Sequence, residues 1–177
     1  MNTRYLMYVH HYPKNNKKSI RTKDRDMETT PTPYEQDEIQ ELWKQIQEHW
    51  DTNGNGWYPM TGSDMPLTVL AFEDAWFYHE IPSDVLKRIL KTHGITRVWE
   101  LREGHASGYE MDTELINLYY DGTEGYWTSE SMDWLIYASH ESLLTVTGEW
   151  LIAAIKALWP HWKEHLYTTY DFERPQP

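Results

Sequence analysis

The chain has 177 residues, no cysteine, a formal net charge of −12 and a mean hydropathy of −0.77. This length fits one domain with an appended arm. The lack of cysteine excludes disulfides, thiolate nucleophiles and zinc–thiolate sites. No apolar run is long enough to span a bilayer or to form the core of a secretory signal, so we expect a cytoplasmic protein without a membrane partner.

Charge is distributed unevenly along the chain. Residues 1–30 carry seven basic and three acidic side chains, whereas residues 31–177 carry nine basic and 25 acidic ones. The acidic part should repel nucleic acid and attract a basic protein partner; only the basic stretch 14–25 could bind phosphate. We interpret residues 1–33 as an N-terminal strand followed by a basic polar arm or linker, and residues 34–177 as a single acidic domain.

In chain order, the first expected elements are a strand over residues 1–12, a polar connection over 14–33 and a helix over 35–50. Five apolar residues of that helix recur at spacings of three and four, which places them on one stripe. They are Ile39, Leu42, Trp43, Ile46 and Trp50. Residues 67–79 look strand-like, with a bulge or turn at Glu73–Asp74, and a helix is expected over 85–92.

Further strands are expected over residues 95–102, in the second half of 109–120, and over 126–127, 134–138 and 143–146. A last helix over 149–158 should end near Pro160. Strands in succession flanked by helices indicate an α+β fold. We expect an antiparallel sheet of about five or six strands, with about three helices packed mainly on one face.

The segment after the first helix matches the first half of a calcium loop. Asp51, Asn53 and Asn55 alternate and are followed by Gly56, as in the pattern D-x-[DN]-x-[DN]-G. Position twelve of the loop, where a bidentate carboxylate belongs, is Gly62. A helix end running into a glycine-rich turn is therefore the favoured interpretation, and weak calcium binding is the alternative; we expect no other cofactor.

A second cluster lies between two predicted strands. His140 and Glu141 are adjacent, and Glu124 is close in sequence, so an imidazole and two carboxylates are available for acid–base or metal chemistry. Ser139 and His140 would point to opposite faces of a strand, which argues against a Ser–His dyad. The competing interpretation is a β-turn whose polar groups bond the local backbone.

Residues His161 to His165 spell H-x-x-E-H, the letters of an inverted zinc-protease motif. Pro160 directly precedes them, and no third ligand is evident, so we favour an ordinary helix end.

Aromatic residues are unusually frequent, with 10 Trp and 13 Tyr. So many large rings are hard to bury completely, and exposed Trp and Tyr beside acidic residues are typical of protein-binding surfaces. We expect four anchors in predicted loops or edges: Trp57, Tyr58, Tyr126 and Trp127. Three acidic residues at the start of the first helix, Glu35, Asp37 and Glu38, would form a charged rim.

The segment Trp134-Leu135-Ile136-Tyr137-Ala138-Ser139-His140-Glu141, with the apolar helix that follows it, resembles a segment of small uncharacterised bacterial and phage proteins. The resemblance covers about the last third of the chain. It implies a bacterial or phage origin and brings no established activity that could be transferred.

Three functional hypotheses follow. The first is a non-catalytic protein-binding module, such as an immunity-type or phage-encoded inhibitor, that recognises a basic partner through an acidic, aromatic-rich surface. The second is a small hydrolase or metal-dependent enzyme centred on His140 and Glu141 with help from Glu124. The third is a weak calcium-binding module at residues 51–56.

Overall fold

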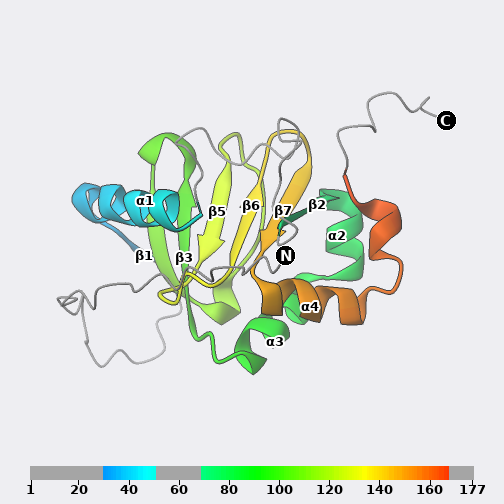
Figure 1. Cartoon of the computed structure of the whole chain (residues 1–177). Helices are drawn as coiled ribbons and strands as arrows, with labels where there is room; N and C mark the ends of the chain where they lie inside the picture. Colours follow the sequence, from blue (N-terminus) through cyan, green and yellow to red (C-terminus); the bar gives the residue numbers. More distant parts are fainter. Residues whose placement is uncertain (1–29, 51–68, 168–177) are drawn as a thin grey trace, which may run out of the picture.

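One antiparallel sheet of seven strands organises the part of the chain that the computed structural model describes, residues 30–50 and 69–167 (Figure 1). Its strands are β1 (Thr32–Pro33), β2 (Val69–Glu73), β3 (Arg97–Arg102), β4 (Gly108–Asp112), β5 (Gly125–Thr128), β6 (Leu135–Ala138) and β7 (Leu143–Thr147). They lie in the order β1-β4-β3-β5-β6-β7-β2, and every neighbouring pair is antiparallel.

Four α-helices and three short 3₁₀ helices accompany the sheet in the described residues. They are α1 (Gln36–Trp50), α2 (Asp74–Glu80), α3 (Ser83–Thr92), α4 (Glu149–Leu158), η1 (Glu103–His105), η2 (Thr113–Leu115) and η3 (Trp162–His165). This confirms the α+β class with one antiparallel sheet. The expected five or six strands and three helices were too few.

The two faces of the sheet carry separate hydrophobic cores, because successive strand residues point to opposite sides. Helix α1 packs its predicted stripe against one face, where Leu101, Tyr126 and Tyr137 lie. Helices α2, α3 and α4 pack against the other face, on alternate residues such as Val98 and Trp127. Figure 1 shows α1 apart from the other three helices. The expectation that the helices share mainly one face therefore holds for three of the four.

Two predicted strand segments end earlier than expected. At Glu73–Asp74, where the sequence suggested a bulge or turn, strand β2 stops and helix α2 begins. Beyond η2, residues 116–124 contain no strand, so the preference for a strand in the second half of 109–120 was wrong. Ile116 and Leu118 are nevertheless buried in the core, which is why their apolar character imitated a strand.

Strand β1 is formed by residues that the sequence analysis assigned to the N-terminal arm. Thr32 and Pro33 pair with Glu110 and Tyr109 of β4. The predicted strand over 1–12 lies outside the described residues. No helix among the described residues has both the length and the apolar character needed to cross a membrane.

Strand β6 passes to β7 through a tight turn at the upper end of the sheet in Figure 1. The Ser139 backbone N–H donates to the Leu143 carbonyl at 3.0 Å, which leaves a loop of three residues, His140 to Ser142. Ser142 has a φ of 60°, as expected for the last residue of such a hairpin loop. The Asp74 N–H donates to the Ser142 carbonyl at 2.9 Å and ties the turn to the start of α2.

Candidate functional site

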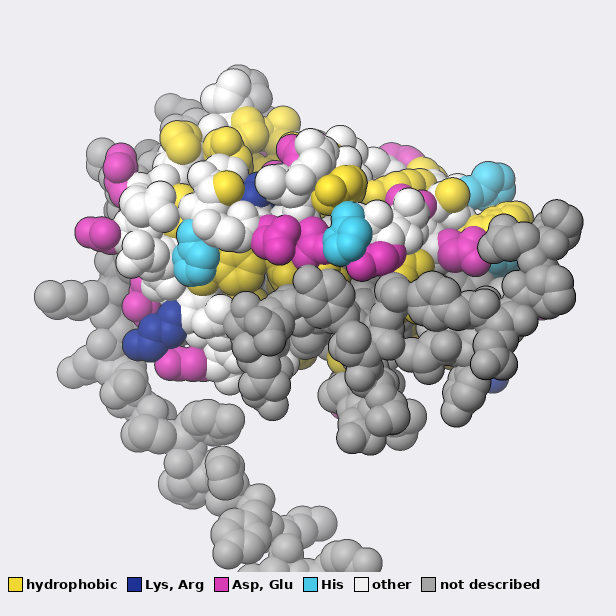
Figure 2. All heavy atoms as spheres, turned by 90° about the horizontal axis from the view of Figure 1, so that it is seen from above, with side chains coloured by type: hydrophobic (Ala, Val, Ile, Leu, Met, Phe, Trp, Pro, Cys, Tyr) yellow, Lys and Arg dark blue, Asp and Glu magenta, His cyan; other side chains and the backbone are white. Residues whose placement is uncertain are grey.

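The turn between β6 and β7 brings three side chains together at one end of the sheet. Glu124 directly precedes β5, whose first residue Gly125 is opposite Ala138 of β6, so Glu124 falls beside the end of that strand. His140 and Glu141 occupy the turn itself. Figure 2 views the molecule from this end and shows acidic side chains gathered on both sides of a histidine.

The imidazole of His140 bridges two carboxylates. Its Nδ1 lies 2.6 Å from Oε1 of Glu124, and its Nε2 lies 2.8 Å from Oε1 of Glu141. The Glu124 side chain is only 2% exposed, the Glu141 side chain 22% and the His140 side chain 52%. A buried carboxylate therefore fixes a half-exposed imidazole, which remains accessible from outside.

Charge around the ring favours the imidazolium form. The pKa of His140 is raised mainly by the hydrogen bond to Glu124; desolvation opposes this, and the negative charges of Glu141, Glu124 and Glu103 add to the increase. In the part of the chain that the structure describes, the charged groups that act on this imidazole are all carboxylates. Its surroundings are therefore suited to a cation and unfavourable for an anion.

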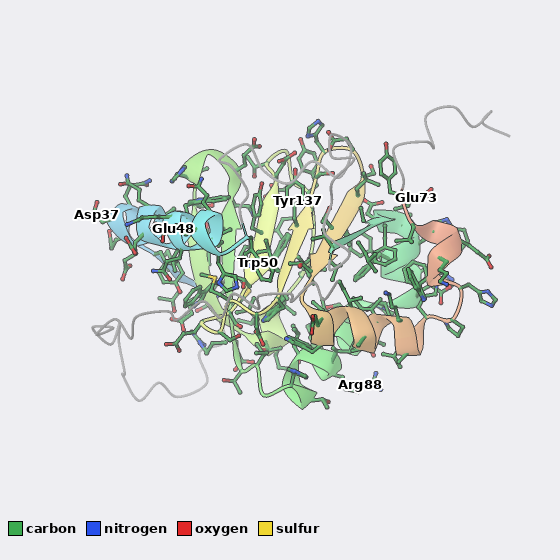
Figure 3. All side chains as sticks on the ribbon, viewed as in Figure 1. Asp37, Glu48, Trp50, Glu73, Arg88 and Tyr137 are labelled. Atoms are coloured by element: carbon green, nitrogen blue, oxygen red, sulfur yellow. The ribbon has the colours of Figure 1, made fainter. Side chains whose placement is uncertain are left out.

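Tyr137 lies beneath the cluster. The register pairs it with Tyr126 on one side and Thr145 on the other, so all three point to the face that α1 covers. The Tyr137 and Tyr126 rings stack with centroids 4.7 Å apart, and Trp43 of α1 meets Tyr126 edge-on at 4.7 Å. Figure 3 labels Tyr137 in the upper part of the sheet.

Several buried polar atoms in this region have no hydrogen-bond partner. They are the Ser139 and Thr145 hydroxyls and Oε2 of Glu141. Burial raises the pKa of Tyr137 strongly, a hydrogen bond from its hydroxyl to Glu124 raises it further, and the charges of Tyr126, Glu124 and Glu141 add to the increase. Leaving buried polar groups unpaired costs free energy, and such groups are rare unless they serve a purpose.

The cluster can also offer ligands to a metal ion. One ligand atom from each of Glu124, His140 and Glu141 can be chosen so that all three lie within 4.8 Å of one another. Across residues 30–50 and 69–167, no other histidine–carboxylate group of three or more is this compact. The three residues named as catalytic from the sequence are therefore brought together.

The surface anchors expected from the sequence are not exposed where the structure describes them. Tyr126 is 2% exposed and Trp127 is fully buried, so neither can contact a partner. They were expected in a loop or edge, but β5 lies inside the sheet between β3 and β6, and both of its faces are covered. The other two anchors, Trp57 and Tyr58, lie outside the described residues, as do Asp51, Asn53 and Asn55 of the calcium hypothesis.

The proposed acidic rim lies at the start of α1. Glu35 and Asp37 are exposed and Glu38 is half-buried, with its Oε2 accepting from the Glu35 backbone N–H at 2.9 Å. Figure 3 shows Asp37 at the outer end of α1, well away from Tyr137. The rim is therefore separate from the histidine cluster.

The H-x-x-E-H segment does not form a shared ligand set. His161 Nδ1 and Glu164 Oε1 are 3.2 Å apart, and both side chains are more than two-thirds exposed. His165 instead lies against the rings of Trp76 and Trp159, at centroid distances of 4.2 and 5.4 Å. The favoured interpretation of an ordinary surface segment agrees with this arrangement.

Sequence reasoning missed Tyr137 and Glu103 as members of the site. Alternation in a strand places Tyr137 on the same face as Ser139, two residues later, so the signal for Tyr137 was present. Glu103 gave no such signal, because its proximity depends on β3 pairing with β5: its N–H donates to the Glu124 carbonyl at 2.9 Å.

Comparisons of the chain with protein-family models, with curated proteins and with solved structures gave no match. Functional inference therefore depends on the chemistry of the site.

Proposed function

We propose that the protein is a small hydrolase whose reaction centre is formed by Glu124, His140 and Glu141. The observation that supports this most is the imidazole held between two carboxylates at 2.6 and 2.8 Å, with one carboxylate buried and the ring half exposed. Hydrolysis requires that water lose a proton and that a leaving group gain one, and these are the side chains that perform such transfers.

Each residue has a distinct part in this proposal. Glu124 is buried and orients the ring through Nδ1, as the carboxylate of a catalytic triad orients its histidine. His140 is accessible to a substrate, and Glu141 supplies the second carboxylate from the turn. The imidazole can serve as a proton carrier or as a ligand of an ion that activates water, and both uses require the same three residues.

The negative charge around His140 limits the class of substrate that the site can accept. Glu103, Glu124 and Glu141 all act on His140, and among the described residues no basic side chain does. The nearby Arg102 belongs to the opposite face of the sheet, where it is paired with Glu100 at 2.7 Å. Phosphate monoesters should therefore be poor substrates, and neutral or cationic esters and amides should be better ones.

A panel of nitrophenyl esters, anilides, glycosides and phosphates tests the proposal with the full chain. We expect turnover of at least one neutral substrate and a loss of about a hundredfold or more in His140→Asn and Glu124→Gln. The matched control is His161→Asn, which alters an exposed histidine that also contacts a glutamate and should keep full activity. Absence of turnover across the panel, or turnover that survives His140→Asn, would contradict the hydrolase proposal.

A protein-binding module is the second candidate. Residues 30–50 and 69–167 carry 21 acidic and eight basic side chains, and α2 exposes Trp76 and Tyr78 by 43% and 37%. Acidic charge with exposed aromatic rings favours a basic protein partner.

Affinity capture from the native host at low and high salt tests this candidate. A partner retained by the wild-type protein should be lost with Trp76→Ala, and more weakly held when Glu35, Asp37 and Glu38 are replaced by their amides. Leu158→Ala, which truncates another exposed apolar residue, is the control. Retention that is insensitive to salt would oppose a charge-steered association.

A further inference from the structure

We propose that Glu124, His140 and Glu141 bind one divalent transition-metal ion, of the class to which Zn²⁺ belongs. This inference deepens the proposed function, because it names the cofactor of the same reaction centre. It starts from the three ligand atoms that lie within 4.8 Å of one another. They come from two parts of the fold, the start of β5 and the β6–β7 turn.

An independent observation also indicates that a ligand belongs here. Oε2 of Glu141, a further oxygen of the cluster, is buried without a hydrogen-bond partner. Ser139, directly before His140 in the chain, is only 2% exposed, and its hydroxyl also has no partner. Unpaired buried oxygens are costly, and a cation bound to the carboxylates would offset part of that cost.

The burial of these atoms favours a single ion as the group that satisfies them. The unpartnered oxygens of Ser139, Thr145 and Glu141 have almost no accessible surface, whereas a substrate would contact the exposed part of His140. A monatomic cation needs only the ligand atoms themselves. The nitrogen and oxygen set suits Zn²⁺, Fe²⁺ or Mn²⁺, whereas Ca²⁺ prefers oxygen ligands alone.

The way the ring bridges the two carboxylates fits metal binding. A metal ion takes one imidazole nitrogen, so it would replace one of the two hydrogen bonds that His140 makes with Glu124 and Glu141. The other hydrogen bond can remain. Histidine ligands in metal sites usually donate their second N–H to a carboxylate or carbonyl, which fixes the orientation of the ring.

Zinc titration of the full chain tests the site directly. The protein is first treated with a chelator to remove any bound metal, and the chelator is then removed. We expect one zinc equivalent to be bound through the cluster, with the affinity lowered about tenfold or more by Glu124→Gln, Glu141→Gln or His140→Asn. The matched control carries His161→Asn and Glu164→Gln, a histidine–glutamate pair at 3.2 Å that is exposed, and it should bind zinc like the wild type.

Thermal unfolding supplies a second readout and checks that the variants fold. Zinc should raise the melting temperature of the wild-type and control proteins, because it binds only the folded site, and should not raise that of His140→Asn. No binding by the wild type at millimolar zinc, or binding unchanged in His140→Asn, would overturn the metal site.

The two proposals can fail separately. Hydrolysis that requires His140 but persists in chelator, without zinc binding, would remove the metal site and leave the hydrolase. Zinc binding through the three residues without turnover of any substrate would remove the hydrolase and leave the metal site.

Discussion

Two clusters of charged side chains lie at the same end of the sheet, on opposite faces. On the face covered by α2, α3 and α4, Glu100 accepts from Arg102 Nε at 2.9 Å and from Trp127 Nε1 at 3.0 Å. The Arg102 guanidinium lies over the rings of Tyr119 and Trp127, at 4.2 and 5.1 Å from their centroids. The Arg102 and Glu100 side chains are 4% and 6% exposed. This network is closed to solvent, although Arg102 Nη2, which lies 2.7 Å from Glu100 Oε1, makes no well-directed hydrogen bond.

The cluster around His140 is built from the same kinds of group but is incomplete. Both carboxylate oxygens of Glu100 are bonded, whereas one oxygen of Glu141 and the Ser139 hydroxyl are not. The histidine of this cluster is half exposed, whereas Arg102 is buried. A buried ion pair whose carboxylate is fully bonded contributes to the fold, whereas carboxylate and hydroxyl oxygens without partners beside an accessible imidazole indicate a place for a ligand.

The largest difference in stability between the two clusters should appear when a carboxylate charge is removed from each. Glu100→Gln leaves Arg102 buried without its countercharge and should lower the free energy of unfolding by about 3 kcal/mol. Urea denaturation measures this. Glu103→Gln, at an exposed residue just beyond the same strand, should change stability by no more than about 0.5 kcal/mol. Equal effects of the two substitutions would show that the buried network is not structurally essential.

Removing a buried hydroxyl that has no partner should have the opposite effect on stability. Thr145→Val removes such a group, so the metal-free protein should become more stable by about 1 kcal/mol in urea denaturation. Tyr119→Phe, which removes a hydroxyl from a ring that is 37% exposed, should have almost no effect. A loss of stability in Thr145→Val would mean that its hydroxyl is bonded in solution.

Titration of His140 in metal-free protein should show its dependence on the buried carboxylate. Its pKa should lie above the ordinary 6.5, and Glu124→Gln should lower it. Because the pKa is raised in the folded state, this contribution to stability is fully present below pH 6.5 and is lost as pH rises through the folded-state pKa. NMR of the imidazole protons measures the titration, and Glu164→Gln should leave the curve unchanged.

The smallest effect on stability is expected at Asp121, at the edge of the network of Glu100 and Arg102. Asp121 Oδ1 lies 3.6 Å from Arg102 Nη1, but the Asp121 side chain is 46% exposed. The pKa of Asp121 is lowered mainly by its hydrogen bond from Thr123 and only secondarily by Arg102. Asp121→Asn should therefore cost no more than about 0.5 kcal/mol in urea denaturation. A loss of stability as large as that of Glu100→Gln would show that Asp121 belongs to the network of Glu100 and Arg102.

Much of the fold was predictable because local pattern and tertiary packing agree. The stripe on α1 predicted which residues are buried: Ile39, Leu42, Trp43 and Ile46. The short, mostly apolar runs at residues 134–138 and 143–146 correctly indicated β6 and β7. The pattern failed at residues 116–124, where Ile116 and Leu118 are buried without belonging to a strand, because burial alone does not specify backbone conformation.

Exposure of the aromatic rings could not be predicted in the same way. Tyr126 and Trp127 belong to a short strand that looks like an edge in the sequence, but β3 and β6 flank it on both sides. Which strands are central depends on the order in which distant segments pair. A strand of four residues carries no information about that order.

For the site, the sequence by itself determined the chemistry that is available: an imidazole and two carboxylates, with His140 and Glu141 adjacent and Glu124 sixteen residues earlier. It also determined that the chain is acidic and has no thiols. Only the tertiary structure decided that Glu124 would be buried against His140, that Glu103 would lie nearby, and that one oxygen of Glu141 would be buried without a partner. The reason is physical: strand pairing sets the distances between residues far apart in sequence, and burial sets the electrostatic environment of each group.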